Sequence, residues 1–219
     1  MKVSPSILAA PLTELGSALR QLDPGVISFI HLDIMDGHFV PALTFGEAVS
    51  AAVKKETNIP LDVHLMVSHP HVEVPKYFPL KPHNITFHYE ATSLPVRLAE
   101  SIREQGILSG LALNPGTPVE VIEELYPFFD LLLIMTVEPG FYGQPFLPTS
   151  WARIERLVKM RERLSKTYNH HMLFEVDGGV NEQNCKRLRE LGIDMVVAGS
   201  FVFKSEDPNE RARILTGND

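Results

Sequence analysis

Short apolar runs alternate along the chain with longer segments that have helical spacing or composition. The strand-like runs cover residues 3–8, 29–33, 61–66, 84–88, 110–113, 131–135, 172–176 and 195–198. Helix-like segments cover residues 11–22, 95–104, 118–125, 150–164 and 181–191, with a short last helix at 208–216. Four prolines in residues 68–83 predict a short helix with irregular flanks. Eight strands alternating with helices predict a closed (β/α)8 barrel, the TIM barrel.

Three of these runs alternate aliphatic and polar residues, and successive side chains of a strand point to opposite faces. An aliphatic outer face is covered by helices, so the polar face must point into the barrel. The polar positions near the carboxyl ends of the runs are His31, Asp33, His64 and Asp177. Buried imidazoles and carboxylates need partners, and one divalent cation can serve all four. The pattern therefore predicts a metal site that also contains an acid/base pair.

Composition sets limits on the class of protein. With 219 residues, 44% of them hydrophobic, the chain is expected to form a single barrel domain over residues 1–219. The net charge of -7 argues against general binding of nucleic acid or of an anionic membrane. Residues 3–10 are too short, and too soon interrupted by Pro11, for a signal peptide or a membrane span. We expect a cytoplasmic protein, in which the single Cys185 is a structural thiol.

Small residues follow the last three strand-like runs, where a barrel enzyme carries its chemistry. Gly178 and Gly179 follow the seventh run, and Gly199 and Ser200 follow the eighth. Glycines at these places let backbone N–H groups approach an anion, which predicts a phosphorylated substrate. The loop 138–146, which contains Gly140 and Gly143, is expected to be a lid; an ordered surface loop is the alternative.

Several motifs together resemble one known family. They are Ser4-Pro5-Ser6-Ile7-Leu8, His31-Leu32-Asp33-Ile34-Met35-Asp36-Gly37, Asp62-Val63-His64-Leu65-Met66, Asn114-Pro115, Gly140 to Gln144, Val176-Asp177-Gly178-Gly179 and Ala198-Gly199-Ser200. In sequence and in order, from residue 4 to about 203, they closely resemble the ribulose-phosphate 3-epimerase family.

The resemblance implies a role for each matching residue. His31, Asp33, His64 and Asp177 would bind one divalent metal, and Asp33 and Asp177 would transfer the protons. Substrate contacts would come from Ser6, His64, Met35, Met66, Met135, Gly140, Gly143 and Gln144, with the three methionines capping the reacting carbon. Phosphate would fall to Gly178, Gly179, Gly199 and Ser200. Zinc is the first expectation for the metal, with Fe(II), Mn or Co as alternatives. The family tendency is to form homo-oligomers.

The residue types also suit an epimerase on chemical grounds. Inverting a carbon beside a carbonyl requires removal of a proton from one face and return of a proton to the other. Asp33 and Asp177 lie on the second and seventh strands, across the barrel mouth. The intermediate is an enediolate, whose charge a metal would stabilise. Methionines offer a polarisable lining, although simple core filling is the alternative for Met66 and Met135.

Other functions stay open at this point. Ala42 replaces a usual asparagine and Tyr142 a smaller residue, so D-allulose 6-phosphate is an alternative substrate to D-ribulose 5-phosphate. Related decarboxylases and aldol synthases place a lysine two positions after the second-strand aspartate, where this chain has Met35. A catalytically silent sugar-phosphate binder is the third option, against which the complete ligand set argues.

The other buried and loop positions are less informative. His88 ends the fourth strand facing inward and could line the site. Asp62 and Glu175 face inward below the metal ligands, where they either orient these ligands or pair with a lysine. The remaining histidines are expected to be solvated: His38, His69, His71, His83, His170 and His171.

Overall fold

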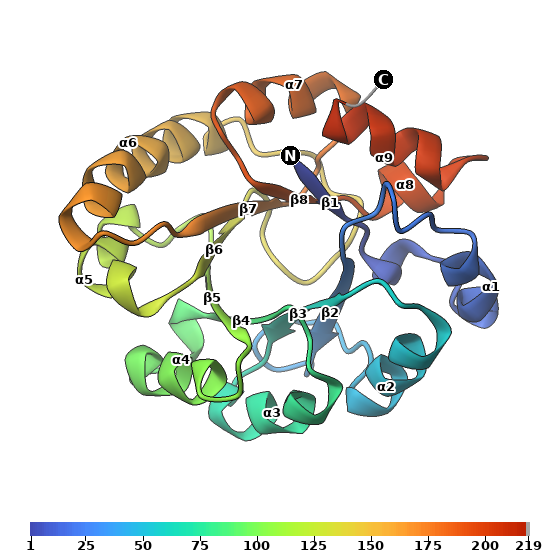
Figure 1. Cartoon of the computed structure of the whole chain (residues 1–219), viewed down its shortest axis with the longest axis horizontal. Coiled ribbons are helices and arrows are strands. Elements are labelled where there is room, and N and C mark those ends of the chain that lie inside the picture. The colour runs from blue at the N-terminus through green and yellow to red at the C-terminus, as the bar shows by residue number, and fades with distance from the viewer. Residues whose placement is uncertain (218–219) are drawn as a thin grey trace.

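Parallel strands form a ring with helices around its outside in the computed structural model, which describes residues 1–217 (Figure 1). The strands are β1 (Lys2–Ser4), β2 (Ile30–Met35), β3 (Leu61–Met66), β4 (Asn84–His88), β5 (Leu108–Leu113), β6 (Leu131–Met135), β7 (Leu173–Asp177) and β8 (Met195–Val197). Neighbouring strands pair in the order β1-β8-β7-β6-β5-β4-β3-β2. A parallel bridge between Ser6 and His31 closes the ring. The predicted (β/α)8 barrel is confirmed.

Helices follow the strands on the outer side of the ring (Figure 1). They are α1 (Leu15–Arg20), α2 (Glu47–Glu56), α3 (Pro70–Tyr77), α4 (Pro95–Arg103), α5 (Ile122–Leu125), α6 (Ser150–Tyr168), α7 (Glu182–Glu190), α8 (Ser200–Phe203) and α9 (Pro208–Thr216). The short third helix and the last helix have the predicted positions. Within the described residues 1–217, no helix has the length and apolar character needed to cross a membrane.

The first strand is shorter than the sequence pattern predicts. The apolar run covers residues 3–8, but β1 ends at Ser4. Pro5 has no N–H to donate to a neighbouring strand. The hydroxyl of Ser6 accepts the N–H of Leu8 at 3.3 Å and begins the 3-10 helix Ile7–Ala9. This early turn leaves Ser6 beside β2, at the mouth of the barrel.

Two predicted helices are partly 3-10 helix. Residues 11–22 form the 3-10 helix Leu12–Glu14 before α1 begins. Residues 118–125 form the 3-10 helix Val119–Val121 and only the single turn of α5. A helix of one turn has few internal hydrogen bonds, so packing against the sheet, through buried Ile122, must hold this segment.

The core has an outer and an inner layer, as the alternation along the strands predicts. Ile30, Leu32 and Ile34 of β2 belong to the large cluster between sheet and helices. Leu131 and Leu133 of β6 belong to a separate cluster inside the barrel. The inner positions of β2 and β3 are instead polar up to Met35 and Met66 at the strand ends, and these polar residues create the site.

Candidate active site

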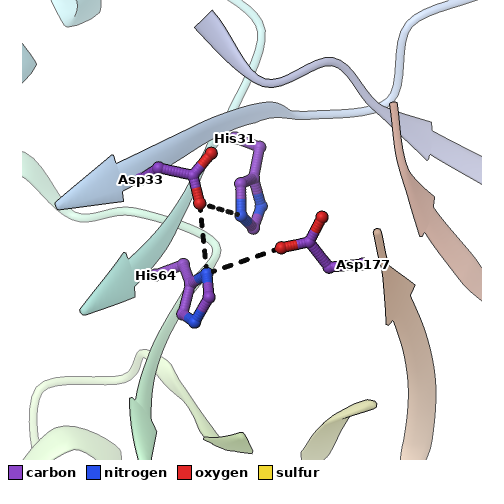
Figure 2. A group of neighbouring side chains, drawn as sticks. All are labelled: His31, Asp33, His64 and Asp177. Atoms are coloured by element: carbon purple, nitrogen blue, oxygen red, sulfur yellow. Dashed lines mark hydrogen bonds and ion pairs between the residues drawn. The ribbon is translucent and has the colours of Figure 1, made fainter. Parts of the chain in front are cut away.

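Two histidines and two aspartates meet at the carboxyl ends of β2, β3 and β7 (Figure 2). Each of His31, Asp33, His64 and Asp177 offers one ligand atom, and these four atoms all lie within 4.8 Å of one another. Asp33 Oδ1 lies 3.3 Å from His31 Nε2 and 3.2 Å from His64 Nδ1, and Asp177 Oδ2 lies 3.8 Å from His64 Nδ1. The β2–β3 register, which pairs Asp33 with His64, produces this convergence.

The donor set of this cluster fits a divalent metal. Two nitrogens and two carboxylate oxygens form a set that Zn²⁺ and similar ions accept. His31 is wholly buried, and its Nε2 has no hydrogen-bond partner among the described residues. Its other nitrogen, Nδ1, donates to Asp62 Oδ2 at 2.6 Å. A histidine whose second nitrogen is held by a carboxylate presents a basic lone pair to a metal.

Asp62 orients His31, and no lysine of residues 1–217 pairs with it. Besides His31 it accepts hydrogen bonds from Ser4 Oγ at 2.8 Å and from Asn84 Nδ2 at 2.7 Å. Glu175 is wholly buried next to this group, and neither of its oxygens has a hydrogen-bond donor among residues 1–217. Burial, and secondly the charge of Asp62, raise the pKa of Glu175 well above its ordinary value. A neutral Glu175 can sit beside an ionised Asp62.

The two central aspartates have opposite pKa shifts. Burial raises the pKa of Asp33, but the charge of His31 and the close contacts of His31 and His64 with this carboxylate outweigh burial and lower this pKa. Burial, followed by the charge of Asp33, raises the pKa of Asp177 to about 7. Burial lowers the pKa of His31, yet Asp62 and Asp33 together raise it well above its ordinary value. One carboxyl is therefore ionised while its neighbour can hold a proton near neutral pH.

The cluster opens into a pocket of about 540 Å³ at the mouth of the barrel. Ser6 lines this pocket, and its hydroxyl donates to Asp33 Oδ2 at 2.5 Å. Met35 and Met66 line it as well and pack together with Val40, while Met135 also belongs to the inner apolar cluster. The three methionines therefore both pack against apolar residues and line the pocket.

Glycines form the β7 and β8 side of the same pocket. Gly178 and Gly179 have φ values of +120° and +66°, where a side chain is strained. A Cβ at Gly179 would lie 2.3 Å from the backbone nitrogen of Phe146. The hydroxyl of Thr136 bonds the carbonyls of Asp177 and Gly178, which fixes the end of β7. Gly199, which precedes α8, and Ser200, the first residue of α8, complete this wall.

The loop 138–146 covers one side of the pocket. Its Gly140, Gly143 and Gln144 all line the pocket. Gln144 Nε2 donates to the carbonyls of Glu138 at 2.6 Å and of Phe141 at 2.9 Å, so this side chain holds the loop together. Phe141 and the adjacent Tyr142 leave 62% and 55% of their surface exposed. Apolar groups this exposed are available to pack on a ligand.

Sequence reasoning missed Lys204. This residue follows α8 and is the only cationic side chain among the described residues that line the pocket. Its Nζ lies 5.4 Å from the centroid of the Tyr142 ring. The missed signal was its position, one helical turn after Gly199 and Ser200.

Two of the six histidines that were expected to be solvated are instead half-buried and contact other residues of the protein. His83, expected to be solvated, stacks on Phe29 with ring centroids 4.3 Å apart. His170, also expected to be solvated, hydrogen-bonds through Nε2 to the carbonyl of Phe129 at 2.7 Å. His38, His69 and His71 are exposed loop or helix-start residues, and His171 is exposed as well. His88 does not line the pocket but lies behind His64.

Comparison with known proteins agrees with this geometry. Residues 2–203 match the model of the Ribulose-phosphate 3 epimerase family. The Ribulose-phosphate 3-epimerase of Bacillus subtilis is 38% identical over 218 residues, covering 100% of this chain and 99% of that protein. The Helicobacter pylori (strain 26695) protein of the same name is 42% identical over 207 residues, covering 94% and 93%.

Solved structures with low sequence identity share the fold. KGPDC from Streptococcus mutans, in complex with D-R5P, superposes with a TM-score of 0.72 at 10% identity, covering 98% of this chain and 95% of that chain. 3-Hexulose-6-phosphate synthase from Salmonella typhimurium gives 0.70 at 18% identity, covering 99% and 97%. These two likenesses support the barrel alone, whereas the family match and the full-length relatives identify the family. This chain belongs to the ribulose-phosphate 3-epimerase family.

Proposed function

We propose that the protein interconverts D-ribulose 5-phosphate and D-xylulose 5-phosphate by inverting carbon 3. The observation that carries this proposal is the pair Asp33 and Asp177, two carboxyl groups with opposite pKa shifts in one pocket. Pairs of titratable groups whose environments separate their pKa values are the usual acid and base of an enzyme. The Bacillus subtilis and Helicobacter pylori relatives are named ribulose-phosphate 3-epimerases.

The two aspartates divide the proton transfers between them. The ionised Asp33 takes the C3 proton from one epimer, and the protonated Asp177 returns a proton to the opposite face of the resulting enediolate. In the reverse direction the two residues exchange these roles. The raised pKa of Asp177, about 7, is close to the value that suits a group that must both accept and release a proton near neutral pH.

His31, Asp33, His64 and Asp177 would hold the metal. When bound, a divalent cation supplies Lewis-acid stabilisation of the negative charge that develops on the substrate oxygens. Zinc is our first choice, with Fe(II), Mn or Co as alternatives that fit the same two imidazoles and two carboxylates. The buried and unpaired Nε2 of His31 supports the assignment.

The glycine wall and the loop 138–146 would receive the rest of the substrate. We assign the phosphate to the backbone of Gly178, Gly179, Gly199 and Ser200, where three glycines and one small side chain leave N–H groups accessible. Met35, Met66 and Met135 line the pocket without exchanging protons, while Ser6 keeps Asp33 oriented. Closure of the loop over the substrate would exclude water. The expectation of a homo-oligomer stays a prediction that light scattering can test.

D-Allulose 6-phosphate is the second candidate substrate. Ala42, where the family usually has an asparagine, packs against the cluster of Met35, Met66 and Val40, and its side chain is smaller than that of asparagine. A decarboxylase or aldolase is less well supported, because Met35 lines the pocket where those enzymes carry a lysine.

Proton NMR in D₂O tests the proposal. The purified protein, supplied with zinc, is incubated with D-ribulose 5-phosphate, and we expect xylulose 5-phosphate with deuterium at C3. The Asp177→Asn variant should lose this exchange. Absence of exchange in the parent protein would refute the pentose reaction, and D-allulose 6-phosphate would then be the next substrate. Unchanged activity in Asp177→Asn would refute the two-carboxylate mechanism.

A further inference from the structure

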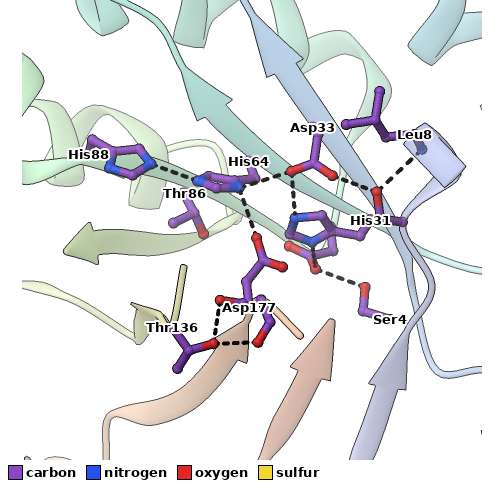
Figure 3. A network of polar contacts seen from close by, with 12 residues as sticks. Ser4, Leu8, His31, Asp33, His64, Thr86, His88, Thr136 and Asp177 are labelled. Atoms are coloured by element: carbon purple, nitrogen blue, oxygen red, sulfur yellow. Dashed lines mark hydrogen bonds and ion pairs between the residues drawn. The ribbon is translucent and has the colours of Figure 1, made fainter. Parts of the chain in front are cut away.

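His64 makes a second close contact on the side away from the pocket. Its Nδ1 faces Asp33 and Asp177, while its Nε2 lies 2.8 Å from Nε2 of His88 on β4 (Figure 3). His64 and His88 are wholly buried, and their rings stack with centroids 5.0 Å apart. Two ring nitrogens this close, with no access for water, must share one proton between them.

If His64 binds the metal, this determines which of the two histidines donates the hydrogen bond. A histidine that binds a metal through Nδ1 must keep that nitrogen unprotonated and carry its proton on Nε2. His64 then donates to Nε2 of His88, which must itself be unprotonated. Since Nε2 of His88 accepts this hydrogen bond, His88 carries its ring proton on Nδ1.

Glu90 lies beside His88 Nδ1, a buried nitrogen that has no hydrogen-bond partner of good geometry among the described residues. Its Oε2 lies 3.4 Å from His88 Nδ1. Its other oxygen accepts the N–H of Asn114 at 2.9 Å and the hydroxyl of Thr117. Burial raises the pKa of Glu90, but these contacts and His88 lower it to about 2, so Glu90 is an anion.

Arg153 of helix α6, outside the barrel, fixes Asn114 and Thr117, the two residues that donate to Glu90. The guanidinium of Arg153 donates to the carbonyls of Asn114 at 3.0 Å and of Pro115 at 3.2 Å, and also to that of Thr117. A series of contacts therefore leads from the pocket through the imidazoles of His64 and His88 to the carboxylate of Glu90, which its other partners hold in place.

We propose that His88 is a positioning residue, which orients His64 with Nδ1 toward the pocket, and that Glu90 sets the tautomer of His88. The proposal rests on the metal set of the proposed function. Partners behind a ligating histidine fix the ring and raise its basicity. His31 has a carboxylate, Asp62, directly behind it; His64 has a neutral imidazole there, and the carboxylate comes one residue later.

Zinc affinity of three variants, measured by competition with a chromophoric chelator, tests the role of His88. His88→Leu should bind zinc about 10- to 100-fold more weakly than the parent. His88→Gln should recover most of this loss, because its side-chain carbonyl can accept the proton of His64 Nε2. His83→Leu is the matched control, since it removes a partly buried histidine just before the same strand and should leave zinc affinity unchanged.

Two outcomes would overturn the proposal. One is His88→Leu binding zinc within about twofold of the parent; the other is equal weakening in His88→Leu and His88→Gln, which would show that only packing matters. A parent protein that binds no zinc would instead refute the metal set.

NMR of the parent protein decides the hydrogen bond without any variant. Histidine ¹⁵N spectra of the zinc-loaded protein should show nitrogen-nitrogen coupling across the bond, with the proton on His64 Nε2. A proton resident on His88 Nε2, or no coupling between the two rings, would overturn the proposal even if His88→Leu failed to fold.

Discussion

On the β2 to β4 side of the barrel mouth, the site consists of side chains that other side chains hold in place, whereas on the β6 to β8 side it consists largely of backbone. His31 and His64 are wholly buried, and each has a polar partner behind it. Gly178 and Gly179 have no side chains, and their conformation excludes one. The side chains of the first side, together with Asp177 at the end of β7, suit a metal and proton transfer, and the glycines of the second side suit an anion.

This difference has a physical basis. Ionisable groups inside a barrel need paired charges and hydrogen bonds, because an uncompensated buried charge is costly. A phosphate needs close approach to N–H groups, which any Cβ would obstruct. Changes in the His31, Asp33, His64 and Asp177 cluster and changes in the glycines should therefore produce different defects. The first should lose metal and chemistry, and the second should lose substrate affinity and stability.

The largest effect is expected from Asp33→Asn. This change removes a metal ligand and a proton-transfer group together, so kcat/KM should fall by at least about 10²- to 10⁴-fold, and zinc affinity should fall as well. Steady-state kinetics and a zinc titration measure both quantities. Asp36→Asn, three residues along the chain and outside the metal set, should keep zinc affinity. Full zinc affinity in Asp33→Asn would contradict the assignment of this ligand.

Gly179→Ala should damage the opposite side. The new Cβ would lie 2.3 Å from the backbone nitrogen of Phe146, at a φ of +66°. We expect a loss of roughly 1–3 kcal/mol in the free energy of unfolding and a raised KM, with zinc affinity retained. Gly116→Ala is the control, since no atom lies within 4 Å of its Cβ position. Equal urea stability of the two variants would show that the glycine wall tolerates a side chain.

Lys204→Met should have a smaller effect, confined to binding. Lys204 is the cation among the described pocket residues, so we expect it to approach the substrate phosphate from beside Tyr142. KM should rise about tenfold, or about 1.4 kcal/mol, with little change in kcat, and added salt should narrow the difference from the parent. Lys166→Met, on the exposed end of α6, serves as control. An unchanged KM in Lys204→Met would remove this residue from the phosphate site.

The smallest effect is expected at Asp36, which ties the loop after β2 to the end of β3. Its carboxylate accepts the N–H groups of His38 at 2.8 Å, Phe39 at 2.9 Å and Ser68 at 2.7 Å. Burial raises the pKa of Asp36, but these N–H groups lower it below its ordinary value of 3.8. A lowered pKa means that ionised Asp36 stabilises the fold above pH 3.8, and that this stabilisation fades at lower pH.

Asp36→Asn should therefore be less stable than the parent at pH 7 by about 1 kcal/mol. The difference should shrink as the pH falls below 3.8, because the parent then loses its own charge at this position. Urea unfolding of both proteins at pH 7 and pH 3 measures it. A difference that grows at low pH would contradict this sign.

Much of the barrel could be predicted because its signals are local. Alternation along β2 and β3 identified the inner residues, and strand ends identified the mouth. The limits of prediction were also physical. Pro5 and the side chain of Ser6 stop β1 early, although the apolar run continues to Leu8. The turn of α5 depends on packing against the sheet more than on its own sequence.

The site shows the same division. Strand periodicity, a property of the covalent chain, was sufficient to predict that His31, Asp33, His64 and Asp177 face the interior. Which ring nitrogen of His64 meets His88, and how Lys204 reaches Tyr142, depend on the spacing of neighbouring strands and on side-chain rotamers. The order of residues along the chain is enough to predict most of the groups at the barrel mouth. Which of them touch depends on how the strands and helices pack, because those contacts join residues that are far apart along the chain.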